Sequence, residues 1–180
     1  MSSTAPPVLD PRQLLQIEAV HRGFLYQHFY TVNCLLLAGP AGVETIAVER
    51  DEDIELVCDE RRLYIQVKTR LRPLSSGDIE EALTRFATLR VEHQAGRRDG
   101  VATFVIAANI APNGPLNGRL NAADWPADVQ IHWPGMPGPI DPALPAPALD
   151  ITHALDACAA LAAQLPFALL TPETLVWKLA

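Results

Sequence analysis

The sequence predicts an α/β sandwich, in which a mixed central sheet is flanked by helices, and three observations carry this prediction. Apolar residues recur at three- and four-residue steps from Leu14 onward, which indicates a long helix. Three alternating segments then follow each other closely between residues 43 and 69, which is typical of a strand meander. A second helical pattern and two further apolar strands complete the order, so that helices are available to flank the sheet.

The first expected element is a helix that begins at Pro11 and continues through at least Leu35. Asp10 fits its N-cap, with proline at the first helical position. Gly23 lies inside the helical pattern, where it costs about 1 kcal/mol relative to alanine. It therefore marks either a break between two helices or a place where another backbone comes close. The glycine- and proline-containing segment 39–42 ends the helical region.

The later elements are predicted from alternation, capping residues and apolar runs. Ser75 to Asp78 begin an amphipathic helix that continues to about Arg90. The apolar run 101–110 is typical of a strand covered on both faces. The proline-rich segment 134–147 predicts a linker or a surface loop. In full, strands are expected at 43–49, 53–58, 63–69, 101–110 and 129–133, a loop at 111–128, and further helices at 150–165 and from residue 171.

The composition limits the classes of function. At 180 residues the chain fits one domain, and its formal net charge of −7 disfavours a passive DNA-binding protein. An enzyme is not excluded, because a local basic cluster can steer DNA while carboxylates bind metal. The three cysteines lack a C-x-x-C pair and fit neither a disulfide framework nor a zinc knuckle. Since there is no secretory signal and no apolar run long enough for a bilayer, we expect a cytoplasmic protein that contacts no membrane.

The residues that carry chemistry lie in the second and third expected strands. Side chains alternate along a strand, so Ile65 and Val67 point into the core while Gln66 and Lys68 point together to the other face. Asp53 lies at the mouth of the preceding strand, thirteen residues before Gln66. A hairpin of that length brings a carboxylate, a side-chain amide and an ammonium group to one edge of the sheet.

These three groups suit the hydrolysis of a phosphodiester. Mg²⁺ prefers oxygen ligands, and it usually keeps several waters beside one or two carboxylates. The metal acidifies a bound water and neutralises the charge that builds up in the transition state. The Asp53 carboxylate, the Gln66 side-chain oxygen and the Val67 backbone carbonyl are candidate ligands. Lys68 is the candidate to orient the attacking water and to stabilise the phosphate.

Three segments together resemble one nuclease family. They are Gly-Phe-Leu-Tyr-Gln-His-Phe-Tyr at 23–30, Asp-Glu-Asp-Ile-Glu-Leu at 51–56 and Tyr-Ile-Gln-Val-Lys-Thr-Arg at 64–70. The last two are similar to the D…QxK variant of the PD-(D/E)XK superfamily, as in Mrr-like restriction enzymes. With the first, the set resembles the double-stranded DNA nuclease domain of bacterial antiphage-defence proteins, which include CD-NTase-associated endonucleases activated by cyclic oligonucleotides. The resemblance covers residues 14 to about 110.

The resemblance implies a restriction-endonuclease-like sandwich and an endonuclease that acts on double-stranded DNA with Mg²⁺, for which Mn²⁺ can substitute. It assigns Asp53 as the metal-binding acid, Gln66 as the second ligand position and Lys68 as the catalytic lysine. Members of the superfamily often contribute a glutamate from the first helix. Glu18 is the candidate for it here, and Gln27 is the second choice.

Double-stranded DNA and a second copy of the chain are the expected partners. Lys68, Arg70 and Arg72 form a basic strip suited to a phosphate backbone, with Gln27 as a further DNA contact. Cutting both strands calls for paired active sites, hence a homodimer or a higher oligomer. We expect residues 1–133 to form the nuclease core and 134–149 a proline-rich loop or linker. Residues 150–180 would form a helical segment that leads into a further domain, such as a sensor or an NTPase.

The same residues have plain structural alternatives. Asp53 can cap a turn, and Gln66 and Lys68 can form the polar face of an edge strand. The other candidates can be ordinary surface residues, with Glu18 on a solvated helix face and Arg70 and Arg72 in ion pairs with Glu80 and Glu81. Two further hypotheses therefore stay open. One is a catalytically inactive nuclease-fold module for DNA binding or oligomerisation, and the other is an α/β binding domain whose resemblance is accidental.

Overall fold

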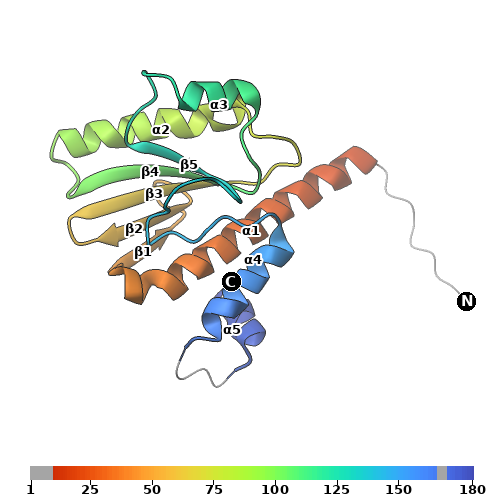
Figure 1. The fold of residues 1–180 in the computed structure, drawn as a ribbon. Coiled ribbons are helices and arrows are strands. Elements are labelled where there is room, and N and C mark those ends of the chain that lie inside the picture. The colour runs from red at the N-terminus through yellow and green to blue at the C-terminus, as the bar shows by residue number, and fades with distance from the viewer. Residues whose placement is uncertain (1–9, 166–169) are drawn as a thin grey trace, which may run out of the picture.

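The fold is an α/β sandwich built on one five-stranded mixed sheet, as the sequence predicts (Figure 1). The computed structural model describes residues 10–165 and 170–180. In chain order the elements are α1 (Pro11–Ala41), β1 (Thr45–Val48), β2 (Ile54–Cys58), β3 (Arg61–Lys68), α2 (Ser76–Gln94), β4 (Val101–Ala108), α3 (Gly114–Leu120), β5 (Val129–His132), α4 (Ile151–Ala162) and α5 (Pro172–Leu179).

The sheet changes character at β3. The strands lie side by side in sequence order, and β1, β2 and β3 pair antiparallel. Strands β3, β4 and β5 pair parallel, because α2 and α3 carry the chain back between them. The tight hairpins of the first half and the helical crossovers of the second are the connections that each kind of pairing requires.

Two apolar cores lie on opposite faces of this sheet. Leu63, Ile65 and Val67 of β3 pack in the core under α1, α4 and α5. Tyr64 packs in the other core, against α2 and β4. Figure 1 shows α1, α4 and α5 on one side of the sheet and α2 and α3 on the other. Because alternate residues of β3 serve different cores, Gln66 and Lys68 face α2, as the predicted alternation requires.

Helix α1 runs without a break through Gly23. Asp10 caps it by accepting a hydrogen bond from the backbone N–H of Arg12 at 2.9 Å, and Gly42 ends it in the left-handed conformation. Neither predicted explanation for Gly23 holds, because the helix is continuous and no other backbone among the described residues comes within 4 Å of a Cβ built there. A Cβ at this position would lie 3.4 Å from the Thr69 hydroxyl oxygen, so the neighbour is a side chain at the end of β3 rather than a backbone.

The loop predicted at 111–128 is wrong in part, because residues 114–120 form α3. Two glycines and an asparagine among these seven residues give the segment a low intrinsic helix propensity. Asn113 caps the helix through a hydrogen bond from the backbone N–H of Leu116 at 2.9 Å. Leu116 is buried in the core on the α2 side. Capping and this tertiary contact outweigh the weak propensity.

The proline-rich segment between β5 and α4 is fastened to α1. Leu144 is buried in the same core as α1. The Tyr26 hydroxyl donates to the backbone oxygen of Ala148 at 2.7 Å and accepts from its N–H at 3.0 Å. Tyr30 donates to the backbone oxygen of Pro145 at 3.2 Å. The segment therefore holds a fixed path between the sheet and the C-terminal helices.

The three cysteines, Cys34, Cys58 and Cys158, are free and buried. Within residues 10–165 and 170–180, no helix combines the length and the apolar content that crossing a membrane requires.

Candidate functional site

Asp53 and Gln66 are neighbours across the β2–β3 hairpin. The strand register pairs Ile54 with Ile65, and one further step along it places Asp53 opposite Gln66. Gln66 donates to Asp53 Oδ2 through its side-chain nitrogen, and the backbone N–H of Val67 donates to the same oxygen at 2.7 Å. Both hydrogen bonds end on Oδ2, and among the described residues none ends on Oδ1. The predicted convergence of Asp53 and Gln66 is therefore present in the structure.

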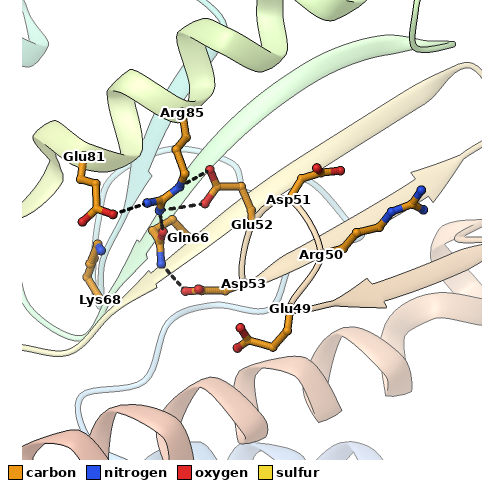
Figure 2. A pocket seen from close by; sticks show the side chains of 9 residues that line it. All are labelled: Glu49, Arg50, Asp51, Glu52, Asp53, Gln66, Lys68, Glu81 and Arg85. Carbon is orange, nitrogen blue, oxygen red and sulfur yellow. Dashed lines mark hydrogen bonds and ion pairs between the residues drawn. The ribbon is translucent and has the colours of Figure 1, made fainter.

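Lys68 joins this pair from the end of β3. It lies on the same face of the strand as Gln66, and its side chain extends beside Glu81 of α2 (Figure 2). Lys68, Asp53 and Gln66 line the same two cavities. Among the described residues the Lys68 ammonium group forms no hydrogen bond or ion pair.

Helix α2 supplies two residues, Arg85 and Glu81, that were not predicted to lie at the site. Arg85 lies over the site and binds Glu52 through two nitrogens, at 3.0 and 3.2 Å. It also donates to Glu81 at 2.7 Å and to the side-chain oxygen of Gln66 (Figure 2). Glu81 and Arg85 have the i, i+4 spacing of a helical ion pair, but only the fold reveals that this pair faces Gln66.

The first cavity, of about 380 Å³, is polar and lies on the α2 side of the hairpin. Five acids and three bases border it together with Gln66: Glu49, Asp51, Glu52, Asp53 and Glu81, and Arg50, Lys68 and Arg85. Glu49 is a second acid close to Asp53. The loop between β1 and β2 closes through a hydrogen bond from the Glu49 backbone N–H to the Asp53 backbone oxygen at 3.1 Å. Glu49 itself is in the left-handed conformation, with a φ of 54°.

The second cavity is a groove of about 990 Å³ on the α1 side. Asp53, Gln66 and Lys68 border this groove as well, so they lie where the two cavities adjoin. Its other walls come from α1, the end of β3 with the loop after it, and the residues that lead into α4. Four basic residues line it, namely Arg22, Lys68, Arg70 and Arg72, and the half-exposed Phe24 lies among the apolar ones.

Burial sets the electrostatics of this region. Desolvation raises the pKa of Asp53 above its ordinary value, although the Val67 N–H and the Lys68 charge oppose the shift. Desolvation also lowers the pKa of Lys68, with Asp53 opposing it and Arg70 and Arg85 adding to it. Burial thus disfavours the charged form of Asp53 and of Lys68, and each charge stabilises the other. A bound cation or phosphate would relieve the same cost.

The structure does not bring Glu18 to this site. Its side chain is 62% exposed and lies 3.8 Å from Arg22 on the next turn of α1, and it borders neither cavity. Gln27, the second choice, does border the groove, and its side-chain nitrogen donates to Glu49. Helix α1 therefore reaches the site through Gln27 and its contact with the acid beyond β1.

Arg70 and Arg72 are ion-paired, but not with the predicted partners. Both bind Asp78 at the start of α2, at 2.7 and 2.9 Å. Glu81 instead binds Arg85, and Glu80 lies 3.8 Å from Arg119. The alternative pairing with Glu80 and Glu81 is not present, because the Asp78 side chain, only 7% exposed, lies in the helix cap where two guanidinium groups reach it from the loop after β3.

The donors present fit a hard divalent cation with few protein ligands. In the part of the chain that the structure describes, no group of three or more His, Cys, Asp or Glu residues forms a metal cage. Asp53 and Glu49 nevertheless offer two carboxylates to one cavity. Mg²⁺ commonly binds through one or two carboxylates and several waters. Gln66 is oriented differently from the prediction, since its oxygen faces Arg85 and its nitrogen faces Asp53.

Comparison with protein-family models, curated proteins and solved structures finds no match to this chain. Fold and site together define an α/β sandwich with a carboxylate, an amide and an ammonium group at the edge of a hairpin.

Proposed function

We propose that this chain is a metal-dependent endonuclease domain that hydrolyses phosphodiester bonds in double-stranded DNA. The supporting observation is the meeting of Asp53, Gln66 and Lys68 where a polar cavity adjoins a groove lined by basic residues. Hydrolysis of a phosphodiester is promoted by an acid that binds a metal cation and by a fixed positive charge that also contacts the phosphate. A duplex backbone that lies along the groove would present a phosphate to both.

Asp53 would hold Mg²⁺ or Mn²⁺ through Oδ1, since its hydrogen bonds engage Oδ2. Glu49 is the second acid on the same wall. When bound, the metal supplies an acidified water and neutralises charge on the phosphate. The chain's own part is to fix the acid, and the Val67 N–H and the Gln66 amide do so from two directions.

Lys68 would contact the scissile phosphate and orient the attacking water. Its pKa is lowered by burial, with the nearby Asp53 carboxylate opposing the shift. An ammonium group that is already partly desolvated, and that makes no hydrogen bond among the described residues, has only a small further desolvation cost when it meets a phosphate oxygen. A preorganised donor of this kind acts through electrostatic stabilisation of the transition state.

The groove would position the DNA. Arg22, Arg70 and Arg72 border it, and contacts of this kind fix the register of a duplex without reading its sequence. Arg70 and Arg72 would share their guanidinium groups between Asp78 and phosphate. The whole chain has a net charge of −7, but of the described residues four bases and only two acids, Asp53 and Asp150, line the groove, so this surface can steer DNA locally.

The biological setting follows from the resemblance in the sequence. We propose a cytoplasmic effector domain of a bacterial antiphage-defence system, acting as a homodimer or higher oligomer. A sensor or NTPase domain in the same protein would control it.

Lys68→Ala tests this function. Wild type should degrade supercoiled plasmid with Mg²⁺ and lose the activity in a chelator, and the variant should be at least about 100-fold slower. Lys178→Ala, at an exposed lysine of α5, is the matched control and should cut at the wild-type rate. Circular dichroism would show that both variants fold. A Lys68→Ala protein that cuts as fast as wild type would refute the proposal.

A second candidate is an inactive module of the same fold that binds DNA or assembles. The orientation of Gln66, with its nitrogen rather than its oxygen toward Asp53, favours it. This candidate predicts DNA binding without cleavage in either Mg²⁺ or Mn²⁺.

A further inference from the structure

Arg85 is anchored to a buried acid. The Glu52 side chain is fully buried in the loop before β2, and it accepts from Arg85 Nε at 3.0 Å and from Nη2 at 3.2 Å. Burial raises the pKa of Glu52, and the bonds from Arg85 oppose that shift. A planar guanidinium group that is bound to one carboxylate through two nitrogens has little rotational freedom left, so its remaining contacts are fixed in direction.

Besides Glu52, Arg85 donates through Nη1 to Glu81 at 2.7 Å and through Nη2 to the side-chain oxygen of Gln66. A glutamine side chain has an acceptor at one end and two donors at the other. With the oxygen given to Arg85, only the nitrogen can face Asp53. The reversed amide would set N–H groups against the guanidinium and an oxygen against the carboxylate, which makes both contacts repulsive. The two charged neighbours thus select one orientation.

We infer that Arg85 is a positioning residue that fixes Gln66 as a hydrogen-bond donor to Asp53, so that Gln66 holds the acid instead of ligating the metal. This inference rests on the proposed nuclease function. In this reading the hydrogen-bonded series Glu52–Arg85–Gln66–Asp53 has one role, which is to direct Asp53 Oδ1 into the polar cavity. Figure 2 shows Arg85 reaching from α2 to both Glu52 and Gln66, with Gln66 in turn bonded to Asp53.

Two substitutions at Arg85 separate positioning from simple support of the fold. Arg85→Lys keeps a positive charge beside Glu52, but a lysine cannot bind Glu52 and Gln66 with one planar fork. Arg85→Met combined with Glu52→Gln removes both charges, so that no carboxylate is left buried without a partner. Arg90→Lys is the matched control on the same helix, because Arg90 makes two bonds to Asp128, at 2.6 and 2.7 Å, away from the site.

The first measurement is steady-state cleavage of plasmid with Mg²⁺. Both changes at Arg85 should lower kcat about 10- to 100-fold, the usual effect of losing a group that orients a ligand, with KM for DNA within about threefold of wild type. Arg90→Lys should leave both constants unchanged. An unchanged kcat in Arg85→Lys, or a rise in KM alone, would overturn the inference, because the latter would make Arg85 a DNA contact.

Gln66→Glu tests the same idea at the other end. If residue 66 acts as a hydrogen-bond donor to Asp53, Gln66→Glu should lower kcat, since the new carboxylate would repel the Asp53 carboxylate. A variant that cuts as well as wild type and needs less Mg²⁺ would show a metal ligand there and contradict us.

A second measurement does not depend on cleavage. In nuclear magnetic resonance spectra, the side-chain NH₂ signals of Gln66 should lie away from the values of solvent-exposed glutamines and exchange slowly with water in wild type and in Arg90→Lys. They should move toward solvent-exposed glutamine values in Arg85→Lys. Wild-type protein that never cuts DNA would defeat the proposed function while these signals still decide the role of Arg85. Unchanged signals in Arg85→Lys would defeat the inference alone.

Discussion

Gln66 lies between a guanidinium and a carboxylate, and each neighbour binds the end of the amide that suits its charge. A glutamate in its place would satisfy Arg85 but repel Asp53. An uncharged side chain thus links the Arg85 guanidinium of α2 to the acid of the hairpin. At the scale of single residues, the site depends on the direction of one amide.

Two glycines illustrate how much a single Cβ can matter. Gly100 has a φ of 83°, and a Cβ there would lie 2.9 Å from the Glu60 backbone oxygen, whereas a Cβ on Gly23 meets the Thr69 hydroxyl at 3.4 Å. Gly100→Ala should therefore lower the free energy of unfolding by more than about 1 kcal/mol. Gly23→Ala should raise it by up to about 1 kcal/mol through helix propensity.

Urea unfolding of the two variants beside wild type would measure both changes. Equal effects at the two positions would contradict the geometry described for them.

Helix α2 joins the site to the loop after β3 through its first turn. Asp78 accepts from Arg70, Arg72 and the backbone N–H of Ser75. Burial raises the pKa of Asp78, but these hydrogen bonds outweigh it and hold the pKa well below the ordinary 3.8. The folded state therefore favours the ionised carboxylate, and its stability depends on pH in a defined direction.

Asp78→Asn should cost about 2 kcal/mol of unfolding free energy at neutral pH, because it removes the charge from the helix cap and from both arginine contacts. The stabilisation by the carboxylate is complete above the unfolded pKa and is lost as pH falls below about 4. The difference in unfolding free energy between wild type and variant, measured by urea unfolding from pH 7 to pH 2, should stay constant at first and then decrease as the pH falls. A gap that widens in acid would show the opposite shift.

Local patterns predicted α1, the meander and α2, because each has its own periodicity and caps. They also predicted that Gln66 and Lys68 share a face, since strand alternation is a property of the backbone. They could not predict that Arg85 binds Gln66, because that contact depends on how α2 packs across the sheet. They also could not predict that Glu49 is a site residue, since only the closed loop after β1 brings it beside Asp53.

At the scale of the whole molecule, residues from the two ends of the chain hold each other. Tyr26 of α1 reaches Ala148 across 122 positions of sequence, and Cys158 of α4 donates to the Phe29 backbone oxygen at 3.2 Å. The proline-rich segment borders the groove through Leu149 and Asp150. Its placement therefore shapes the surface on which DNA is proposed to lie.

Tyr26→Phe should lower the free energy of unfolding by about 1 kcal/mol, because both backbone groups of Ala148 lose their partner while the ring stays packed. Tyr30→Phe removes one bond to the Pro145 oxygen, at 3.2 Å, and should cost less. Thermal unfolding of both variants would establish the order. A larger loss in Tyr30→Phe would contradict the importance given to the contact with Ala148.

The separation of contacting residues along the chain also bears on the order in which the molecule assembles. Asp53 and Gln66 are 13 residues apart on one hairpin, Arg85 is 19 residues beyond Gln66, and the Tyr26 contact spans 122. Closing a short loop costs less entropy than closing a long one. We expect the acid and its amide to meet early in folding, the guanidinium to arrive with the crossover helix, and the wall of the groove to close last.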